Sequence, residues 1–212
     1  MYNCQVTGFN DKADATTRAP RTSTDPMTGS HLADPTRVDA SPDLIVTTAS
    51  ADETQRVGEA LGRLLLPGDL VLLQGSLGSG KTTFTQGVAR GMGLTSRVTS
   101  PSFTLANVYS PNDHGFPLNH LDLWRIKSAE EALGIGLEEY LSEDASCIIE
   151  WPDVAASVFP DEHVRIRFTA NLDQRELSFR VDGTRGVAVV AALRDALQIQ
   201  SVESGDARAP GN

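Results

Sequence analysis

The stretch from residue 75 to residue 83 reads Gly75-Ser76-Leu77-Gly78-Ser79-Gly80-Lys81-Thr82-Thr83, and the apolar run Leu70-Val71-Leu72-Leu73 precedes it. It satisfies the pattern G-x-x-x-x-G-K-[ST] between a predicted buried strand and a helix predicted to begin near Gly80. Glycines are needed here because the backbone must fold tightly around phosphate groups with its N–H groups pointing inward. The stretch therefore predicts a phosphate-binding loop.

The chemistry of this loop predicts that the chain binds a nucleoside triphosphate. The loop N–H groups and the positive end of the following helix are expected to hold the β-phosphate. Lys81 is expected to reach the β- and γ-phosphate oxygens, and the hydroxyl of Thr82 is expected to bind Mg²⁺. The motif alone leaves the reaction open.

Composition restricts the class of protein. The chain has 212 residues, of which 40% are hydrophobic and 6% aromatic, and this suits one globular domain with tails. Its net charge of −10 argues against tight, autonomous binding to a polyanion, so any nucleic acid is expected to be held by a partner. No apolar stretch is long enough to span a membrane, and the two cysteines have no metal-ligand spacing. We expect a cytoplasmic protein that makes no contact with a membrane.

Hydrophobic periodicity predicts the domain organisation. Residues 1–42 are expected to be a disordered leader, 43–199 the folded domain, and 200–212 a disordered tail. Strands and helices alternate around the loop, and clean apolar–polar alternation at 164–169 and 177–182 predicts an antiparallel hairpin. The predicted fold is α/β: a three-layer P-loop NTPase-like domain with a central mixed sheet and an antiparallel C-terminal hairpin.

Two carboxylates at the ends of predicted strands are candidate catalytic groups. Glu150 ends the buried run that starts at Cys147, and in phosphate-loop enzymes an acid at such a position holds Mg²⁺. Asp122 ends another strand and is expected to orient water or to support the metal from beyond its direct ligands. Both of these acids and Lys81 are the predicted catalytic residues.

A hydroxyl-rich segment follows the loop helix. It contains Ser100, Pro101, Ser102 and Phe103, and in isolation it predicts a loop that leads into a strand. Downstream of a phosphate loop, nucleotide switches carry such a segment to sense the γ-phosphate. We therefore predict that these four residues behave like a switch.

Three other polar residues receive weaker predictions. His114 is expected to be a solvated turn residue and His120 to alternate along a strand, and neither is expected to be a ligand. Arg175 lies at the turn of the C-terminal hairpin. An exposed turn arginine is the simpler interpretation, and contact with the nucleotide is the alternative.

Several motifs together resemble the bacterial TsaE (YjeE) ATPases over roughly residues 43–183. Besides the phosphate loop they are Thr99-Ser-Pro-Ser-Phe-Thr-Leu105, His120-Leu-Asp-Leu-Trp-Arg125, Leu137-Glu-Glu-Tyr-Leu141 and Ile149-Glu-Trp-Pro152. The resemblance implies ATP and Mg²⁺ as cofactors, and a role in making threonylcarbamoyladenosine next to the anticodon of tRNA. It also implies weak activity alone, with TsaB and TsaD as protein partners and tRNA contacted only through them.

The resemblance also implies roles for individual residues. Thr82 and Glu150 would ligate Mg²⁺, Asp122 would be an essential acid, and Thr54 would lie near the base. Trp151 would pack close to the nucleotide. Phosphate binding would fall to Gly78, Ser79, Gly80, Lys81, Thr82 and Thr83.

Two positions depart from the family pattern. Ser102 stands where the family usually has Thr, and Trp124 stands where it usually has Tyr. Because the hydroxyl and the aromatic ring are kept, both changes are conservative.

Other functions remain open on sequence grounds. A small-molecule or nucleoside kinase shares the loop, but arginines for a lid are sparse between Lys81 and Glu150. A GTPase is disfavoured because the chain has no Asn-Lys-x-Asp motif for guanine. A nucleotide-gated binding module differs from a partner-dependent ATPase mainly in whether partners change turnover.

Overall fold

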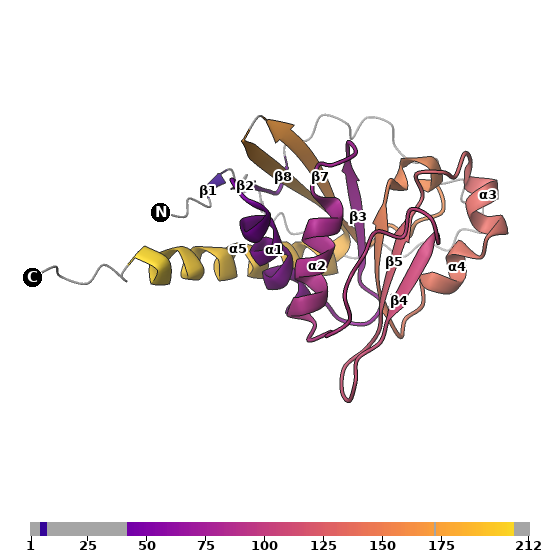
Figure 1. Ribbon diagram of the computed structural model, residues 1–212, viewed down its shortest axis with the longest axis horizontal. Helices are drawn as coiled ribbons and strands as arrows, with labels where there is room; N and C mark the ends of the chain where they lie inside the picture. The colour runs from indigo at the N-terminus through magenta and orange to yellow at the C-terminus, as the bar shows by residue number, and fades with distance from the viewer. Residues whose placement is uncertain (1–4, 8–41, 172, 206–212) are drawn as a thin grey trace, which may run out of the picture.

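The computed structural model describes residues 5–7, 42–171 and 173–205. Its strands and helices follow one another along the chain as a mixture of both types (Figure 1). In order they are β1 Gln5–Thr7, β2 Leu44–Thr48, α1 Ala51–Gly62, β3 Leu70–Gly75, α2 Lys81–Gly91, β4 Ala106–Tyr109, β5 Leu118–Asp122, α3 Ala129–Gly134, α4 Leu137–Tyr140, β6 Ser146–Glu150, the 3₁₀ helix η2 Pro152–Ala155, β7 His163–Asn171, β8 Gln174–Asp182 and α5 Gly183–Gly205.

All the described strands belong to one sheet in the order β1-β2-β8-β7-β3-β6-β5-β4. β3 is parallel to both β6 and β7, β5 is parallel to β6, and the remaining pairs are antiparallel. The predicted mixed sheet and antiparallel C-terminal hairpin are confirmed. The hairpin lies inside the sheet, because β7 pairs with β3 and β8 pairs with β2. The strand that carries the phosphate loop is therefore central.

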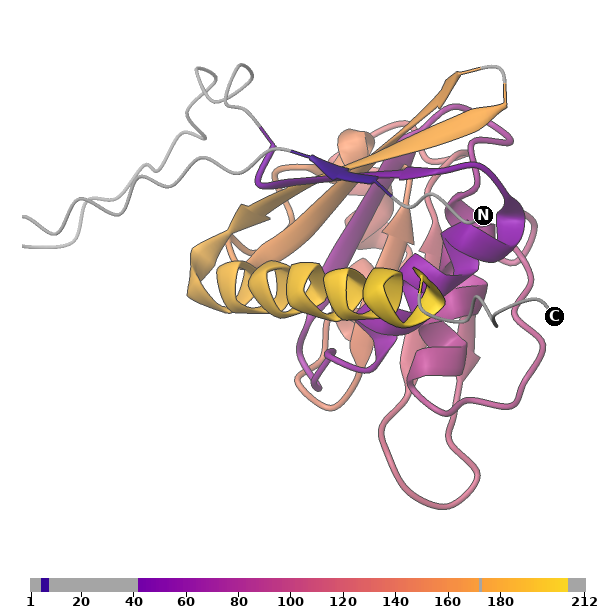
Figure 2. The same cartoon turned by 90° about the vertical axis from the view of Figure 1, so that its left-hand side faces the viewer.

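Helices cover both faces of the sheet and form the predicted three layers. In Figure 1, α1, α2 and α5 gather on one side of the strands, and α3 and α4 lie on the other. In Figure 2 the long helix α5 lies in front of the sheet. Two clusters of buried side chains fill the spaces between the layers, one under α1, α2 and α5 and one under α3, α4 and η2. The four buried residues Leu70–Leu73 contribute alternately to both clusters, as expected for a central parallel strand.

Helices α1 and α2 approach each other unusually closely through glycines. A Cβ built at Gly58, Gly62, Gly87 or Gly91 would lie 2.2, 2.2, 2.0 or 2.1 Å from a backbone oxygen of the opposite helix. Real Cβ atoms do not come within 3.0 Å of such a neighbour. Glycine at two positions four residues apart on each helix therefore lets the two backbones touch, and this fixes α1 relative to α2.

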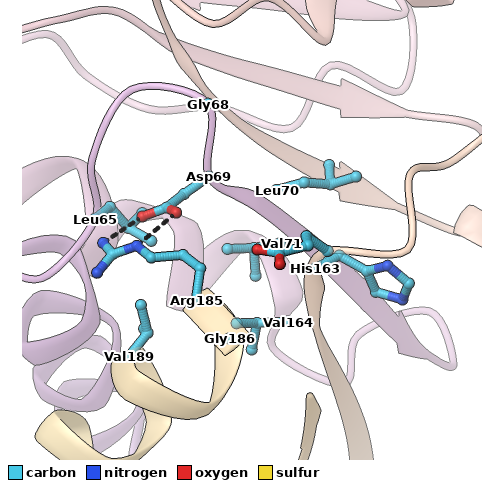
Figure 3. A pocket seen from close by; sticks show the side chains of 11 residues that line it. Leu65, Gly68, Asp69, Leu70, Val71, His163, Val164, Arg185, Gly186 and Val189 are labelled. Carbon is cyan, nitrogen blue, oxygen red and sulfur yellow. Dashed lines mark hydrogen bonds and ion pairs between the residues drawn. The ribbon is translucent and has the colours of Figure 1, made fainter. Parts of the chain in front are cut away.

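A small cavity of about 70 Å³ lies at the end of β3 opposite the phosphate loop (Figure 3). The guanidinium of Arg185, on α5, donates hydrogen bonds to both carboxylate oxygens of Asp69 across this cavity, at 3.0 and 2.7 Å. It also donates to the carbonyl oxygen of Leu64 at 2.8 Å. These bonds tie the first turn of α5 to the connection between α1 and β3.

The boundaries differ from the sequence predictions at three places. Gln5–Thr7, within the expected leader, pairs with β2 as an antiparallel strand. α5 runs from Gly183 to Gly205, past the predicted end of the folded domain at residue 199 and into the tail that was expected to be disordered. The strand expected after the hydroxyl-rich segment, β4, does not follow Phe103 directly but starts at Ala106, because Leu105 has a φ of 70° and interrupts the strand. The rest of the predicted leader and tail, residues 1–4, 8–41 and 206–212, lies outside the described residues.

None of the helices in the described ranges combines the length and the apolar character that a membrane crossing requires.

Candidate functional site

The phosphate loop joins the end of β3 to the start of α2, as predicted. Gly75 has a φ of 145°, and a Cβ there would lie 2.7 Å from the carbonyl oxygen of Phe168 on β7. Gly80 caps α2 with a φ of 108°, and a Cβ there would press on the side chain of Arg175 at 3.4 Å. Both positions require glycine, and the loop can place its backbone N–H groups around a phosphate.

Lys81 is the first residue of α2, and its ammonium group turns back towards the loop. Nζ donates to the carbonyl oxygens of Gly75 and Ser76 at 2.9 and 3.0 Å, and it lies 4.1 Å from the centre of the Trp151 ring. Burial lowers the pKa of Lys81, against the raising effect of the nearby Glu150 and Asp122 carboxylates. The ammonium is therefore desolvated beside two acids and placed at the loop.

Trp151 follows β6 in an unusual backbone conformation. Its φ of 60° is in the left-handed region that tryptophan seldom occupies, and such a conformation is commonly found at functional sites. Its ring packs against Trp124, tilted by 51° with 4.4 Å between the ring centres, and it also lies over the Lys81 ammonium. The two tryptophans thus form an aromatic wall beside the loop lysine.

Thr82 and Glu150, the two predicted metal ligands, lie in direct contact. The Thr82 hydroxyl donates to Oε1 of Glu150 at 2.9 Å, and Glu150 is only 3% exposed. One hydroxyl and one carboxylate are hard oxygen donors, the set that Mg²⁺ uses when phosphate and water supply its other ligands. No group of three or more His, Cys, Asp or Glu side chains in the described ranges could hold a metal ion by itself. The residues fit a magnesium ion that is shared with a nucleotide.

Asp122 lies next to Glu150 in the sheet but has its own partners. The two residues are register neighbours on the parallel strands β5 and β6. Oδ2 of Asp122 accepts a hydrogen bond from the hydroxyl of Ser102 and one from Ser100 at 3.4 Å, and Oδ1 accepts the Trp124 N–H at 2.9 Å. Asp122 therefore attaches the predicted switch-like segment to the end of β5.

The switch-like segment turns tightly and exposes a phenylalanine. The carbonyl oxygen of Pro101 accepts the N–H of Leu105 at 2.7 Å, and the Phe103 side chain is 88% exposed. The guanidinium of Arg125 lies 4.7 Å from the centre of the Phe103 ring. The serines of this segment face Asp122 while its aromatic residue faces outward.

Thr54 and Arg175 both lie beside Gly80 of the loop. A Cβ at Gly80 would be 3.8 Å from the Thr54 methyl group and 3.4 Å from Cδ of Arg175. The Thr54 hydroxyl is buried and bonds the hydroxyl of Thr48 at 2.9 Å, so the methyl group faces the loop. Arg175 is only half-buried, so both interpretations of this arginine stay predictions.

The remaining loop residues differ in their surroundings. Gly78 has a φ of 75° and open space where a Cβ would be, and Thr83 is half-buried on α2. Ser79 is buried, and its hydroxyl has no hydrogen-bond partner among the described residues. An open hollow of about 440 Å³ adjoins the first loop residues, lined by Gln74, Gly75, Ser76, Asp153, Arg167, Phe168, Thr169 and Ala170.

His120 belongs to this site although sequence reasoning assigned it no role. It is fully buried on β5, and its Nε2 lies 3.0 Å from Oε1 of Glu150. The sequence did contain a clue to this position. His120 and Asp122 are two residues apart on one strand, so their side chains must lie on the same face of the sheet. That face is the one on which Glu150 lies.

A central parallel strand, a glycine-rich loop with its lysine at a helix start, and an acid on the adjacent parallel strand define a P-loop NTPase-like protein. Comparisons with known proteins narrow this class. Residues 48–177 match the family model described as threonylcarbamoyl adenosine biosynthesis protein TsaE.

Two similar proteins carry the name tRNA threonylcarbamoyladenosine biosynthesis protein TsaE. The one from Bacillus subtilis is 38% identical over 139 residues, 65% of this chain and 85% of its own length. The one from Treponema pallidum is 40% identical over 141 residues, 66% of this chain and 95% of its own length. A crystal structure of Bacillus subtilis YdiB superposes with a TM-score of 0.62 and 33% identity, covering 72% of this chain and 94% of YdiB. The chain belongs to the TsaE family, and the predicted resemblance is confirmed.

Proposed function

We propose that this protein is a Mg²⁺-dependent ATPase that supports threonylcarbamoyladenosine modification of tRNA next to the anticodon. We propose that it acts in the cytosol with TsaB and TsaD, that its activity alone is weak, and that hydrolysis resets the complex between turnovers. Family membership supports the pathway. The observation that carries the ATPase assignment is the contact of Thr82 with Glu150 beside the buried Lys81 ammonium.

The proposed mechanism is in-line attack of water on the γ-phosphate of ATP, with positioning and charge neutralisation contributing most of the rate. The loop N–H groups and Lys81 bind the phosphates, and Thr82 and Glu150 hold the metal. When bound, Mg²⁺ neutralises charge that develops on the phosphate oxygens. Asp122 is proposed either to orient the water or to support the metal from beyond its direct ligands. Its hydrogen bonds to Ser100 and Ser102 would also hold the Ser100–Phe103 segment where that segment senses the γ-phosphate.

The other proposed contacts surround these groups. Gly78, Ser79, Gly80 and Thr83 complete the phosphate cradle. Thr54 and Arg175, which adjoin Gly80, are proposed to contact the nucleotide. Trp151 is proposed to pack near the phosphates, since its ring already covers Lys81.

Lys81→Ala tests the nucleotide chemistry, and Lys127→Ala is its matched control because Lys127 is an exposed lysine far along the chain from the loop. We expect Lys81→Ala to reduce ATP turnover by about 100-fold or more, the loss typical of removing one group that stabilises developing charge. Lys127→Ala should keep the wild-type rate. Full turnover in Lys81→Ala would refute the proposed site.

The effect of partner proteins on ATP turnover tests the proposed role in tRNA modification. ATP turnover is measured for the chain alone, then with TsaB and TsaD from the same organism, while tRNA modification is followed in parallel. We expect a low basal rate that rises with the partners and several rounds of modification. If ADP forms only when a nucleoside or a small alcohol is added, the alternative function, a small-molecule or nucleoside kinase, would be favoured.

A further inference from the structure

We propose that His120 is a positioning residue that orients the Glu150 carboxylate for the metal. This inference rests on the proposed function, because it assigns a role within the proposed Mg²⁺–nucleotide site.

The sheet brings the two side chains together. His120 pairs with Ile148 on the parallel strand β6, and Glu150 lies two residues further along that strand on the same face. His120 is 0% exposed and Glu150 is 3% exposed, and Nε2 lies 3.0 Å from Oε1. Both side chains are therefore held in place by strands rather than by a loop.

Glu150 receives two hydrogen bonds on the same oxygen. Thr82 donates to Oε1 at 2.9 Å, and His120 meets that atom at 3.0 Å. Among the described residues, Oε2 accepts no comparable bond. Two donors on one oxygen restrict rotation of the carboxylate and direct the second oxygen to other partners, such as a metal ion or its water.

The contact with Glu150 requires a hydrogen on Nε2 of His120, because the carboxylate oxygen Oε1 is an acceptor. Nδ1, the other ring nitrogen, is buried without a hydrogen-bond partner among the described residues. An unpartnered buried ring nitrogen destabilises a fold, whereas an apolar side chain at this position would not. Stability alone therefore does not account for a histidine here, and the bond to Glu150 does.

Thr82 cannot replace His120 in this task. Its oxygen is proposed to bind the metal, so its hydrogen bond to Glu150 must fit the metal geometry as well. His120 contacts neither the loop backbone nor Lys81 in the described interactions. Loss of His120 should therefore weaken metal binding and leave the nucleotide contacts made by the loop intact.

The test compares three variants. His120→Leu removes the hydrogen-bond donor and places a buried apolar side chain at position 120. His120→Gln keeps an amide N–H that can reach the position of Nε2, whereas His120→Asn carries the same amide one methylene short of it. Because Gln and Asn have the same chemistry and differ in reach, their comparison separates hydrogen bonding to Glu150 from general polarity.

The readout is binding rather than turnover. Mn²⁺ affinity is measured in the presence of ADP by electron paramagnetic resonance of the free ion, and ADP affinity is measured separately with EDTA present. Thermal melting of each variant reports on folding. We expect the Mn²⁺ dissociation constant to rise about 10- to 100-fold in His120→Leu and His120→Asn, the range seen when a residue that supports a metal ligand is removed. His120→Gln should stay within a few-fold of wild type, and metal-free ADP affinity should be unchanged in all three.

Two results would overturn the inference. Equal Mn²⁺ affinity in His120→Gln and His120→Asn would show that reach to Glu150 is irrelevant, and this comparison decides the matter even if His120→Leu does not fold. Equal losses of Mn²⁺ affinity and metal-free ADP affinity would indicate general damage to the site. A wild-type chain that binds neither Mn²⁺ nor ADP would instead refute the proposed function itself.

Discussion

The close contact between α1 and α2 makes Gly58→Ala an informative substitution. A Cβ at position 58 would lie 2.2 Å from the carbonyl oxygen of Phe84 and 3.1 Å from the backbone N of Val88. The first distance is 0.8 Å short of the 3.0 Å that real Cβ atoms keep. Because the obstructing atom belongs to a helix backbone, no side-chain rotation relieves the clash, and α1 must move away from α2.

The expected magnitude combines two opposing effects. Alanine is a better helix former than glycine by about 0.8–1.0 kcal/mol. Overpacking a well-filled interior typically destabilises by about 1–3 kcal/mol and occasionally by more. The displacement also loosens Val57 and Leu61 from the buried cluster beneath them. We expect a net destabilisation of about 2 kcal/mol, which lowers the melting temperature of a domain of this size by about 4–8 °C.

Urea unfolding followed by circular dichroism measures this effect. Gly134→Ala is the matched control, because Gly134 ends α3 and nothing lies within 4 Å of the position its Cβ would take. The control should leave the free energy of unfolding unchanged or raise it by up to about 1 kcal/mol, because only the helix propensity changes. A Gly58→Ala chain at least as stable as wild type would refute the argument that the glycines permit helix contact.

Three further predictions concern residues outside the loop. Arg185→Ala should lower the free energy of unfolding by about 1–2 kcal/mol in urea denaturation, because it removes two charge-assisted bonds to Asp69; an unchanged value would mean that this pair does not hold α5. Burial lowers the pKa of His163, so the folded chain favours the neutral form of this side chain. The resulting stabilisation of the fold is complete above the ordinary histidine pKa of about 6.5, and it is lost as the pH falls below that value. The stability of wild type relative to His163→Gln should therefore decrease between pH 7.5 and 5, and parallel stability curves would contradict this. Burial also raises the pKa of the Cys147 thiol, so in a Cys4→Ser chain a thiol reagent at pH 8 should react only at the rate of unfolding, and rapid reaction of the folded chain would show that the thiol is accessible.

The sequence predicted the phosphate loop and its flanking elements because their signals are local. Glycine spacing, the lysine and an apolar strand all lie within about fifteen residues. The position of Glu150 beside the loop was also predictable, since a carboxylate at the end of a buried strand in a phosphate-loop protein tends to lie there. Its role as a metal ligand stays a prediction. The structure brings its carboxylate to Thr82 as expected.

Strand order and helix contact could not be predicted in this way. The alternation at 164–182 indicates an apolar face but not which strand lies beside it, so the insertion of β7 next to β3 was not foreseen. In the sequence, Gly58 and Gly62 look like residues that merely weaken a helix. Their role in the contact with α2 is visible only in the structure. His120 was missed because its partner Glu150 is thirty residues away and only strand pairing joins them.

The central position of β7 has a consequence for synthesis of the chain on the ribosome. β3, at residues 70–75, leads into the phosphate loop, and one of its two neighbours in the sheet is β7, at residues 163–171. β2 likewise pairs with a strand that is synthesised much later, β8, at residues 174–182. Until those residues emerge, one edge of β3 has no partner, and pairing between such distant segments is intrinsically slow. A message truncated before codon 163 would therefore encode every proposed site residue except Arg175, yet its product would lack the strand that pairs with one edge of β3.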